Sequence, residues 1–194
     1  TISNDYDMTG NHGLYDVFVI KLSVTGTLLW RKCYGGAGDD SAYTIQQTNE
    51  GGYIVLGSTS STSGDVVGLH GTNTDIWVLK LSEDGMIQWQ KCLGGSTTDW
   101  AMVRGSRSIQ QTAEGGYILI GTTWSNDGDV SGIHNPGSGH PDVWVVKLAE
   151  NGVIQWQRCL GGSNDDTGGS IQQSTDRGYI LAGYTDSTDG DVTG

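Results

Sequence analysis

Short segments with a period-two pattern of apolar and polar side chains recur along the chain. In residues 87–93, IQWQKCL, the two kinds of side chain alternate as they do in a half-buried β-strand. The pattern returns at 28–34 and 154–160, each time after a mostly apolar segment at 16–22 (DVFVIKL), 75–81 (DIWVLKL) or 142–148 (DVWVVKL). Short turns containing Gly separate the members of each pair, so the pattern predicts antiparallel β-hairpins.

The chain consists of copies of one unit. The apolar segments begin 59 and then 67 residues apart, and a fixed period of this length indicates a repeated supersecondary unit. Local insertions, five residues around 100–107 and three around 135–141, explain the longer second period. The landmarks that keep step are Trp30, Trp89 and Trp156; Cys33, Cys92 and Cys159; the Gly pairs at 35, 94 and 161; Gln46, Gln110 and Gln172; and Tyr53, Tyr117 and Tyr179.

Each unit predicts four short antiparallel strands followed by a long polar loop, which is typical of a β-propeller blade. We therefore expect an all-β, β-propeller-like array of three four-stranded antiparallel blades, part of a larger propeller or repeat array. Residues 1–15 are assigned to the end of a preceding repeat, and residues 16–74, 75–141 and 142–194 to three blades. A β-trefoil and other β arrays remain alternatives.

Three blades cannot close a ring, because propellers use about four to eight. A slice of a larger propeller, two chains joined in a six-bladed ring and an open string of units all remain open. Residues 1–10 match residues 185–194, which favours the slice or the string and suggests a fragment of a longer array. Exposed strand edges are expected to pair with other copies or with neighbouring repeats.

The composition argues against nucleic-acid binding and a membrane-spanning helix, and it favours a protein with many tight turns. A net charge of −12 disfavours nucleic acid as a partner, because binding a polyanion needs a basic surface. No apolar run approaches the roughly 18–20 residues of a membrane-spanning helix. The 32 Gly residues are spread evenly, as tight turns between strands require. The Cys residues occupy one repeat position, too far apart for disulfides, and are expected to be free buried thiols.

The units resemble the tandem propeller-like surface repeats of secreted and cell-surface proteins from Bacteroidetes, which are cargo of type IX secretion, and from archaea. The resemblance rests on residues 125–134 (SNDGDVSGIH), 142–148, 154–163 (IQWQRCLGGS) and 170–183, and it covers the whole chain. It implies an extracellular or cell-surface location and a scaffold or adhesive role. The family carries no general catalytic motif.

Acidic loops are the candidate metal sites. Carboxylates with neighbouring Ser or Asn oxygens, bent around a Gly, resemble the first half of a calcium-binding loop, although the downstream bidentate Glu is missing. The alternative is that these side chains only build Asx turns. Calcium is thus the candidate ion, with the candidate ligands Asp5, Asp7, Asp65, Asn126, Asp127, Asp129, Asp189 and Asp191.

Other polar residues also follow the repeat. His12, His70 and His134 each lie two residues after a Gly of the acidic loop, and a structural role is favoured over metal binding. The pairs Asp39–Asp40 and Asp165–Asp166, reduced to Asp99 in the middle copy, could serve glycoside hydrolysis. A catalytic site occurs once, however, whereas these residues recur. We therefore interpret them as turn-forming residues and predict no enzyme.

Two tryptophans break the repeat. Trp30, Trp89, Trp156, Trp77 and Trp144 occupy repeated strand positions and are expected to pack between blades. Trp100 and Trp124 have no aromatic counterparts, and with Arg104 and Arg107 they form a candidate glycan site, because flat aromatic faces stack on sugars. Local packing of the loop is the alternative.

Three functions follow. The first is a non-enzymatic extracellular repeat module acting as a surface scaffold, adhesion or assembly protein, with calcium as a stabilising ion. The second is a lectin-like propeller that binds surface glycans. The third is a non-catalytic part of a larger secreted enzyme.

Overall fold

The computed structural model describes residues 10–101 and 107–193, and within these ranges the chain is all-β. The strands pair only in antiparallel fashion, as predicted. Their bounds are β1 Val17–Leu22, β2 Leu28–Tyr34, β3 Asp40–Gln47, β4 Tyr53–Thr59, β5 Asp75–Leu81, β6 Ile87–Leu93, β7 Asp99–Trp100, β8 Ile109–Gln111, β9 Tyr117–Thr123, β10 Asp142–Leu148, β11 Ile154–Leu160, β12 Asp166–Gln173 and β13 Tyr179–Thr185. A 3-10 turn, Gly190–Val192, is the helical structure of the described ranges, and it cannot span a bilayer.

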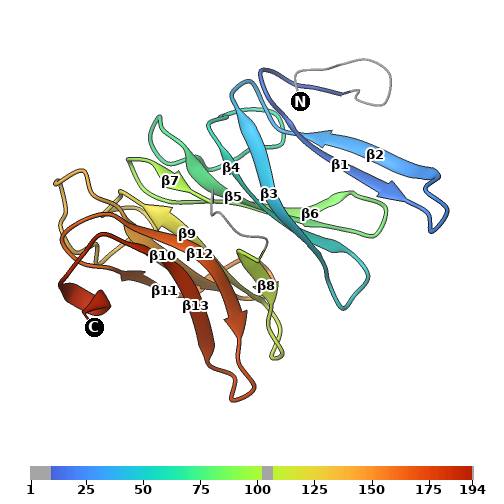
Figure 1. Cartoon of the computed structure of the whole chain (residues 1–194). Helices are drawn as coiled ribbons and strands as arrows, with labels where there is room; N and C mark the ends of the chain where they lie inside the picture. Colours follow the sequence, from blue (N-terminus) through green and yellow to red (C-terminus); the bar gives the residue numbers. More distant parts are fainter. Residues whose placement is uncertain (1–9, 102–106, 194) are drawn as a thin grey trace.

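The strands form four sheets that follow one another in chain order (Figure 1). The first sheet holds β1 and β2, the second β3–β4–β5–β6, the third β7 and β8 beside β9–β10–β11, and the last β12 and β13. The third sheet has five strands because residues 101–108, which include the first insertion, separate β7 from β8, and both pair with β9.

The prediction of one four-stranded blade for each repeat is wrong. The second sheet takes β3 and β4 from the repeat at 16–74 and β5 and β6 from the repeat at 75–141. Each repeat is thus divided between two sheets, and the described chain contains two-stranded sheets at both ends. The sheets of two to five strands replace the predicted set of three equal blades.

Burial explains where the sheets divide. All seven residues of β5 are buried, and so are six of the seven in β4. Strands this apolar need a neighbour on both edges and on both faces, so β4 and β5 pair with each other across the long polar loop at 60–74. The same pairing joins β9 to β10.

The core lies between consecutive sheets. Trp77 of β5 is 1% exposed and packs in one cluster with Val17 and Val19 of β1. Edge-on ring contacts join Trp30 to Tyr53 and Trp89 to Tyr117, at 6.0 and 5.9 Å between ring centroids. The predicted packing of the repeated tryptophans between sheets is therefore confirmed.

The cysteines are free, as predicted. Cys92 and Cys159 are buried, whereas Cys33 in the two-stranded first sheet is half-buried. Burial raises the pKa of both Cys92 and Cys159 to about 12, so these thiols stay protonated near neutral pH and act as small apolar side chains.

Candidate functional site

The predicted metal loops contact the turns that connect consecutive sheets. Asp127 Oδ1 accepts the main-chain N–H of Ser96 at 2.7 Å, and Asp189 Oδ1 accepts that of Ser163 at the same distance. Asp65 Oδ2 accepts the N–H of Gly35 at 3.2 Å. These hydrogen bonds lower the pKa values of Asp127 and Asp189, so both carboxylates are ionised near neutral pH.

The histidines lie between two carboxylates from different elements. His70 Nδ1 is 2.7 Å from Asp75 Oδ2, and its Nε2 is 3.7 Å from Asp129 Oδ2. His134 repeats the arrangement with Asp142 at 2.6 Å and with Asp191 at 3.3 Å. His12 makes the contact equivalent to that between His70 and Asp75, since its Nδ1 is 2.7 Å from Asp16 Oδ2. His70 and His134 therefore each connect the start of the strand that follows them to the acidic loop of the next sheet.

A second buried carboxylate holds the Gly-Gly turn. Asp99 Oδ2 accepts the N–H of Gly95 at 2.8 Å and the hydroxyl of Ser125 at 2.8 Å, and its other oxygen accepts the hydroxyl of Thr123. Equivalent bonds surround Asp40 and Asp166. These bonds join the turn before each of these strands to the loop that follows the neighbouring strand.

The carboxylates that contact the histidines and those that hold the Gly-Gly turns lie close to each other. A Cβ atom at Gly94 would lie 2.5 Å from Asp99 Oδ2 and 3.0 Å from Asp75 Oδ1, so this position accommodates only Gly. Burial, with a smaller contribution from the nearby Asp99 carboxylate, raises the pKa of Asp75 to about 6 against the opposing effect of the His70 hydrogen bonds. The arrangement can store a proton at mildly acidic pH.

The acidic residues do not converge on a common point. Among the described residues, no group of three or more His, Cys, Asp or Glu side chains could hold a metal ion. Asn126 is exposed in its loop, and Asp5 and Asp7 lie outside the described residues. The carboxylates of Asp65, Asp127 and Asp189 instead accept main-chain N–H groups of Gly35, Ser96 and Ser163, which are distant in the sequence, so these bonds are not the local ones of an Asx turn.

The residues that break the repeat meet in one pocket. The rings of Trp100 and Trp124 are 5.6 Å apart at an angle of 76°, and Trp100 is 38% exposed. A pocket of about 480 Å³ opens beside them, with a lining of Thr97, Thr98, Trp100, Trp124, Ile133, Gly137, Gly139 and His140. The second insertion thus lines this pocket together with Trp100 and Trp124.

Hydrogen bonds hold this pocket in shape. Trp124 Nε1 donates to the carbonyl of Gly139 at 3.0 Å, and His140 Nδ1 is 2.6 Å from Asp165 Oδ1. Arg107 is exposed and is not part of the lining, while Arg104 lies outside the described residues. Sequence reasoning missed His140 and Ile133 as lining residues. The three-residue insertion, which has no counterpart in the first copy, was the available signal.

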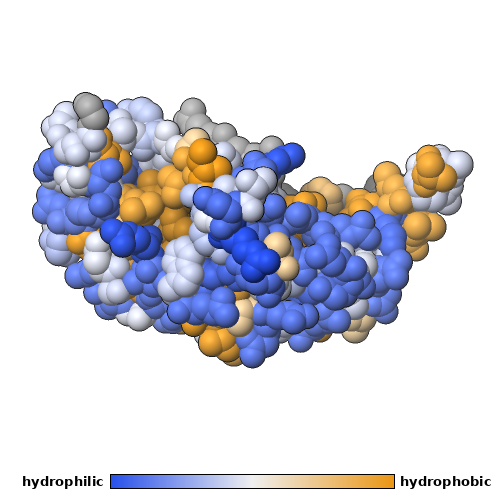
Figure 2. Space-filling model, turned by 90° about the horizontal axis from the view of Figure 1, so that it is seen from below, coloured by the Kyte–Doolittle hydropathy of each residue, from blue (hydrophilic) through white to orange (hydrophobic). Residues whose placement is uncertain are grey.

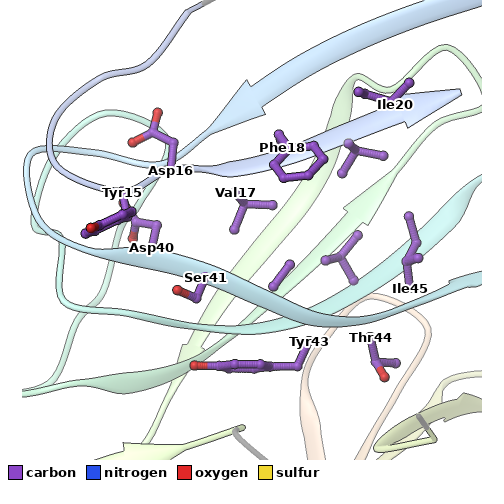
Figure 3. A pocket seen from close by; sticks show the side chains of 13 residues that line it. Tyr15, Asp16, Val17, Phe18, Ile20, Asp40, Ser41, Tyr43, Thr44 and Ile45 are labelled. Atoms are coloured by element: carbon purple, nitrogen blue, oxygen red, sulfur yellow. The ribbon is translucent and has the colours of Figure 1, made fainter. Parts of the chain in front are cut away.

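A second pocket, of about 490 Å³, lies between the first two sheets (Figure 3). Its lining is mostly apolar and comes from β1, β3 and the turns before them: Val17, Phe18 and Ile20 on one side, Tyr43, Thr44 and Ile45 on the other. Tyr43 and Ile45 of β3 are exposed there, as is Phe18 of β1.

A comparison of the chain with protein-family models finds no match, and neither does a comparison with curated proteins.

Proposed function

We propose that the chain is a non-enzymatic repeat module of the β-propeller type, which builds an extracellular or cell-surface scaffold by joining other copies of itself. The four-stranded order β3–β4–β5–β6 is that of a complete blade, and the two-stranded sheets at the ends correspond to its halves. The extracellular location and the adhesive role come from the resemblance to surface repeats.

The observation that carries the proposal is the exposure of core positions at both ends of the row of sheets. Ile180 of β13 is 66% exposed, whereas Ile54 and Ile118 at the same repeat position are 0% exposed. Ile45 of β3 is 51% exposed, whereas its equivalents Ile109 and Ile171 are 3% and 2% exposed. Apolar surface of this kind favours association.

Figure 2 shows further apolar surface, as orange atoms, at the end of the molecule formed by β1 and β2. Strand edges add to it, because β1 and β13 each have one neighbour where their repeat equivalents have two. An unpaired edge presents a row of N–H and C=O groups that another strand can satisfy.

Light scattering over roughly 1–100 µM protein tests the proposal, since this range covers modest association constants. We expect the mass to rise from that of one chain to that of rings or polymers, which electron microscopy of the same fractions distinguishes. A mass that stays at one chain throughout would contradict the scaffold function.

The pocket at Trp100 and Trp124 favours a second candidate function, the binding of surface glycans. Trp100 offers aromatic surface, and the hydroxyls of Thr97 and Thr98 together with His140 line the same pocket as hydrogen-bonding groups. A glycan array probed with the intact chain and with Trp100→Ala tests it. Trp156→Ala is the matched control, because Trp156 is 40% exposed but is not part of the pocket lining. Loss of binding in both variants, or in neither, would contradict a glycan site at this pocket.

A further inference from the structure

We propose that β13 of one copy pairs with β1 of a second copy, antiparallel and in one register, with Thr185 opposite Asp16 and Tyr179 opposite Leu22. This inference rests on the proposed function, because it names the strands and the register through which copies associate. The new sheet, in the order β12–β13–β1–β2, would repeat the order β3–β4–β5–β6.

The register comes from the two equivalent pairings inside the chain. In β4 and β5, Thr59 lies opposite Asp75 and Tyr53 opposite Leu81. In β9 and β10, Thr123 lies opposite Asp142 and Tyr117 opposite Leu148, so both pairings have the same register over seven residues. The sequence YILAGYT of β13 matches YIVLGST of β4 and YILIGTT of β9, and β1 with Asp16 matches β5 and β10.

In the single chain, the side chain of Phe18 in β1 is not covered as its repeat equivalents are. It is 48% exposed, whereas Trp77 and Trp144 at the same repeat position are 1% and 0% exposed. Gly57 lies opposite Trp77 and Gly121 opposite Trp144, which leaves the indole room beside the neighbouring strand. Gly183 occupies the same position in β13 and would leave the same room beside Phe18 of the second copy.

The pocket in Figure 3 is the space that β13 of the neighbouring copy would fill. Inside the chain, the inner strand β12 contacts β9 of the preceding sheet, and a Cβ atom at Gly168 of β12 would lie 2.6 Å from the Ile120 side chain. The equivalent of Gly168 in β3 is Ala42, which lines the pocket. Since the equivalent of Ile120 in β13 is Ala182, a pair of small side chains would meet at this point.

The glutamines supply a second, independent match. Gln46 Oε1 accepts the main-chain N–H of Gln111 at 3.0 Å, and Gln110 Oε1 accepts that of Gln173 at 2.9 Å, so each sheet is linked to the next. Continuing this series places the N–H of Gln47 at Oε1 of Gln172 from the neighbouring copy. Both residues are exposed, in contrast to half-buried Gln110 and Gln111.

The acidic loop at this junction is already present in the C-terminal copy of the motif. Asp191 donates its N–H to the carbonyl of Gly161 at 2.8 Å, as Asp129 does to Gly94 and Asp65 to Gly35. Because each copy offers both edges, copies can continue as an open row or close on themselves.

Disulfide cross-linking between copies tests the register. Cys33, Cys92 and Cys159 are first replaced by Ala, and two single-cysteine variants, Lys21→Cys and Ile180→Cys, are then mixed under mild oxidation. The internal pairings place Ile54 opposite Lys80 and Ile118 opposite Lys147, so residues 21 and 180 would be opposite each other at about 4.5–5.5 Å between Cα atoms, within the range of a disulfide.

Leu22→Cys mixed with Ile180→Cys is the matched control. Leu22 is also exposed, but a shift of one residue moves the side chain to the other face of the sheet. We expect a disulfide-linked dimer in the first mixture, at least about tenfold more abundant than in the control, and none in either variant alone.

Each other result overturns the inference. Association by light scattering without preferential linking of residues 21 and 180 would reject the register while leaving the scaffold function standing. Preferential linking of Leu22→Cys would replace it with a register shifted by one residue. A chain that stays a monomer at every concentration would reject both the register and the scaffold function.

Discussion

The main-chain N–H of Gln111 in β8 donates a 3.0 Å hydrogen bond to Oε1 of Gln46 in β3, a residue of the preceding sheet. The second glutamine of the motif continues the contact, since Gln111 Oε1 accepts the N–H of Asn49 and its Nε2 donates to Glu50, both at 2.9 Å. Gln110 and Gln173 repeat the arrangement one sheet further on. The glutamine side chains of the recurring IQQ motif therefore link neighbouring sheets, while its main chain pairs with the next strand of its own sheet.

Loss of one link should destabilise the chain. Gln110→Met keeps the length of the side chain but removes the acceptor of the Gln173 N–H, so we expect the free energy of unfolding to fall by about 0.5–1.5 kcal/mol. Urea denaturation of dilute protein measures this change in the free energy of unfolding. Gln172→Met is the control, because Gln172 has the same motif position and its side chain is exposed in the single chain. Equal losses in the two variants would argue against the link.

Stability should fall as pH rises from about 4 to about 6, the range set by Asp75, and the fall should continue above the usual pKa of His134. Burial raises the pKa of Asp75 to about 6, and a hydrogen bond with Asp142 raises the pKa of His134 above its usual 6.5. A group whose pKa is higher in the folded state stabilises that state below its unfolded pKa and loses the effect as pH rises through the folded pKa. Denaturant titrations at several pH values test this.

Asp75→Asn is the variant that isolates the carboxylate. It keeps an oxygen to accept the N–H of His70 but removes the titrating group, so the decline between pH 4 and pH 6 should become shallower. Asp84→Asn is the control, since Asp84 is exposed and its pKa is lowered by a hydrogen bond from Ser82. An unchanged slope in Asp75→Asn would show that other groups control the pH dependence.

The sequence predicted the strands better than the sheets. The recurrence of Trp30, Trp89 and Trp156 located the β1–β2, β5–β6 and β10–β11 hairpins, because a repeated unit keeps its period wherever its boundary is drawn. Because the period does not depend on where the boundary is drawn, it could not show where one sheet ends and the next begins. The β4–β5 pairing crosses the polar loop at 60–74, which is too long for a hairpin turn, so local reasoning treated the loop as a boundary.

The site was only partly predictable for a similar reason. Trp100 and Trp124 could be recognised because they break the repeat, and the structure places their rings 5.6 Å apart. The contribution of His140 depends on how the second insertion folds back over Trp124, through the hydrogen bond to Gly139. Contacts between two irregular loops leave no periodic pattern in the sequence.

Arg177 offers a stabilising substitution. It has a φ of 69° in the β12–β13 turn, where the equivalent turns have Gly51 and Gly115 with φ of 89° and 83°. A left-handed conformation costs a residue with a Cβ atom about 1–2 kcal/mol, and the greater freedom of Gly in the unfolded chain offsets part of this. Arg177→Gly should therefore raise the unfolding free energy by about 0.5 kcal/mol, and Gly115→Ala should lower it by about 1 kcal/mol. Opposite shifts in thermal unfolding would confirm the reasoning, and a loss in Arg177→Gly would contradict it.

Calcium should leave the melting temperature unchanged. Asp127 and Asp189 each accept a main-chain N–H at 2.7 Å, and Asp129 and Asp191 face histidine nitrogens, so binding an ion would require breaking contacts that already hold the loops. Thermal unfolding in millimolar calcium and in EDTA at constant ionic strength measures this. A rise of several degrees in calcium, lost in Asp127→Asn, would instead establish the loops as calcium sites.

A single carboxylate on β13 should separate the copies without unfolding them. Ile180 is 66% exposed in the single chain, so Ile180→Asp should leave its melting temperature nearly unchanged, yet the proposed junction would bury the new charge without a partner. Such burial is costly, and we expect the dissociation constant to increase by at least about tenfold. Val153→Asp is the matched control, because Val153 is 53% exposed in the β10–β11 turn and the variant carries the same added charge. Equal weakening by both variants would mean that net repulsion between acidic chains, rather than the face of β13, controls association.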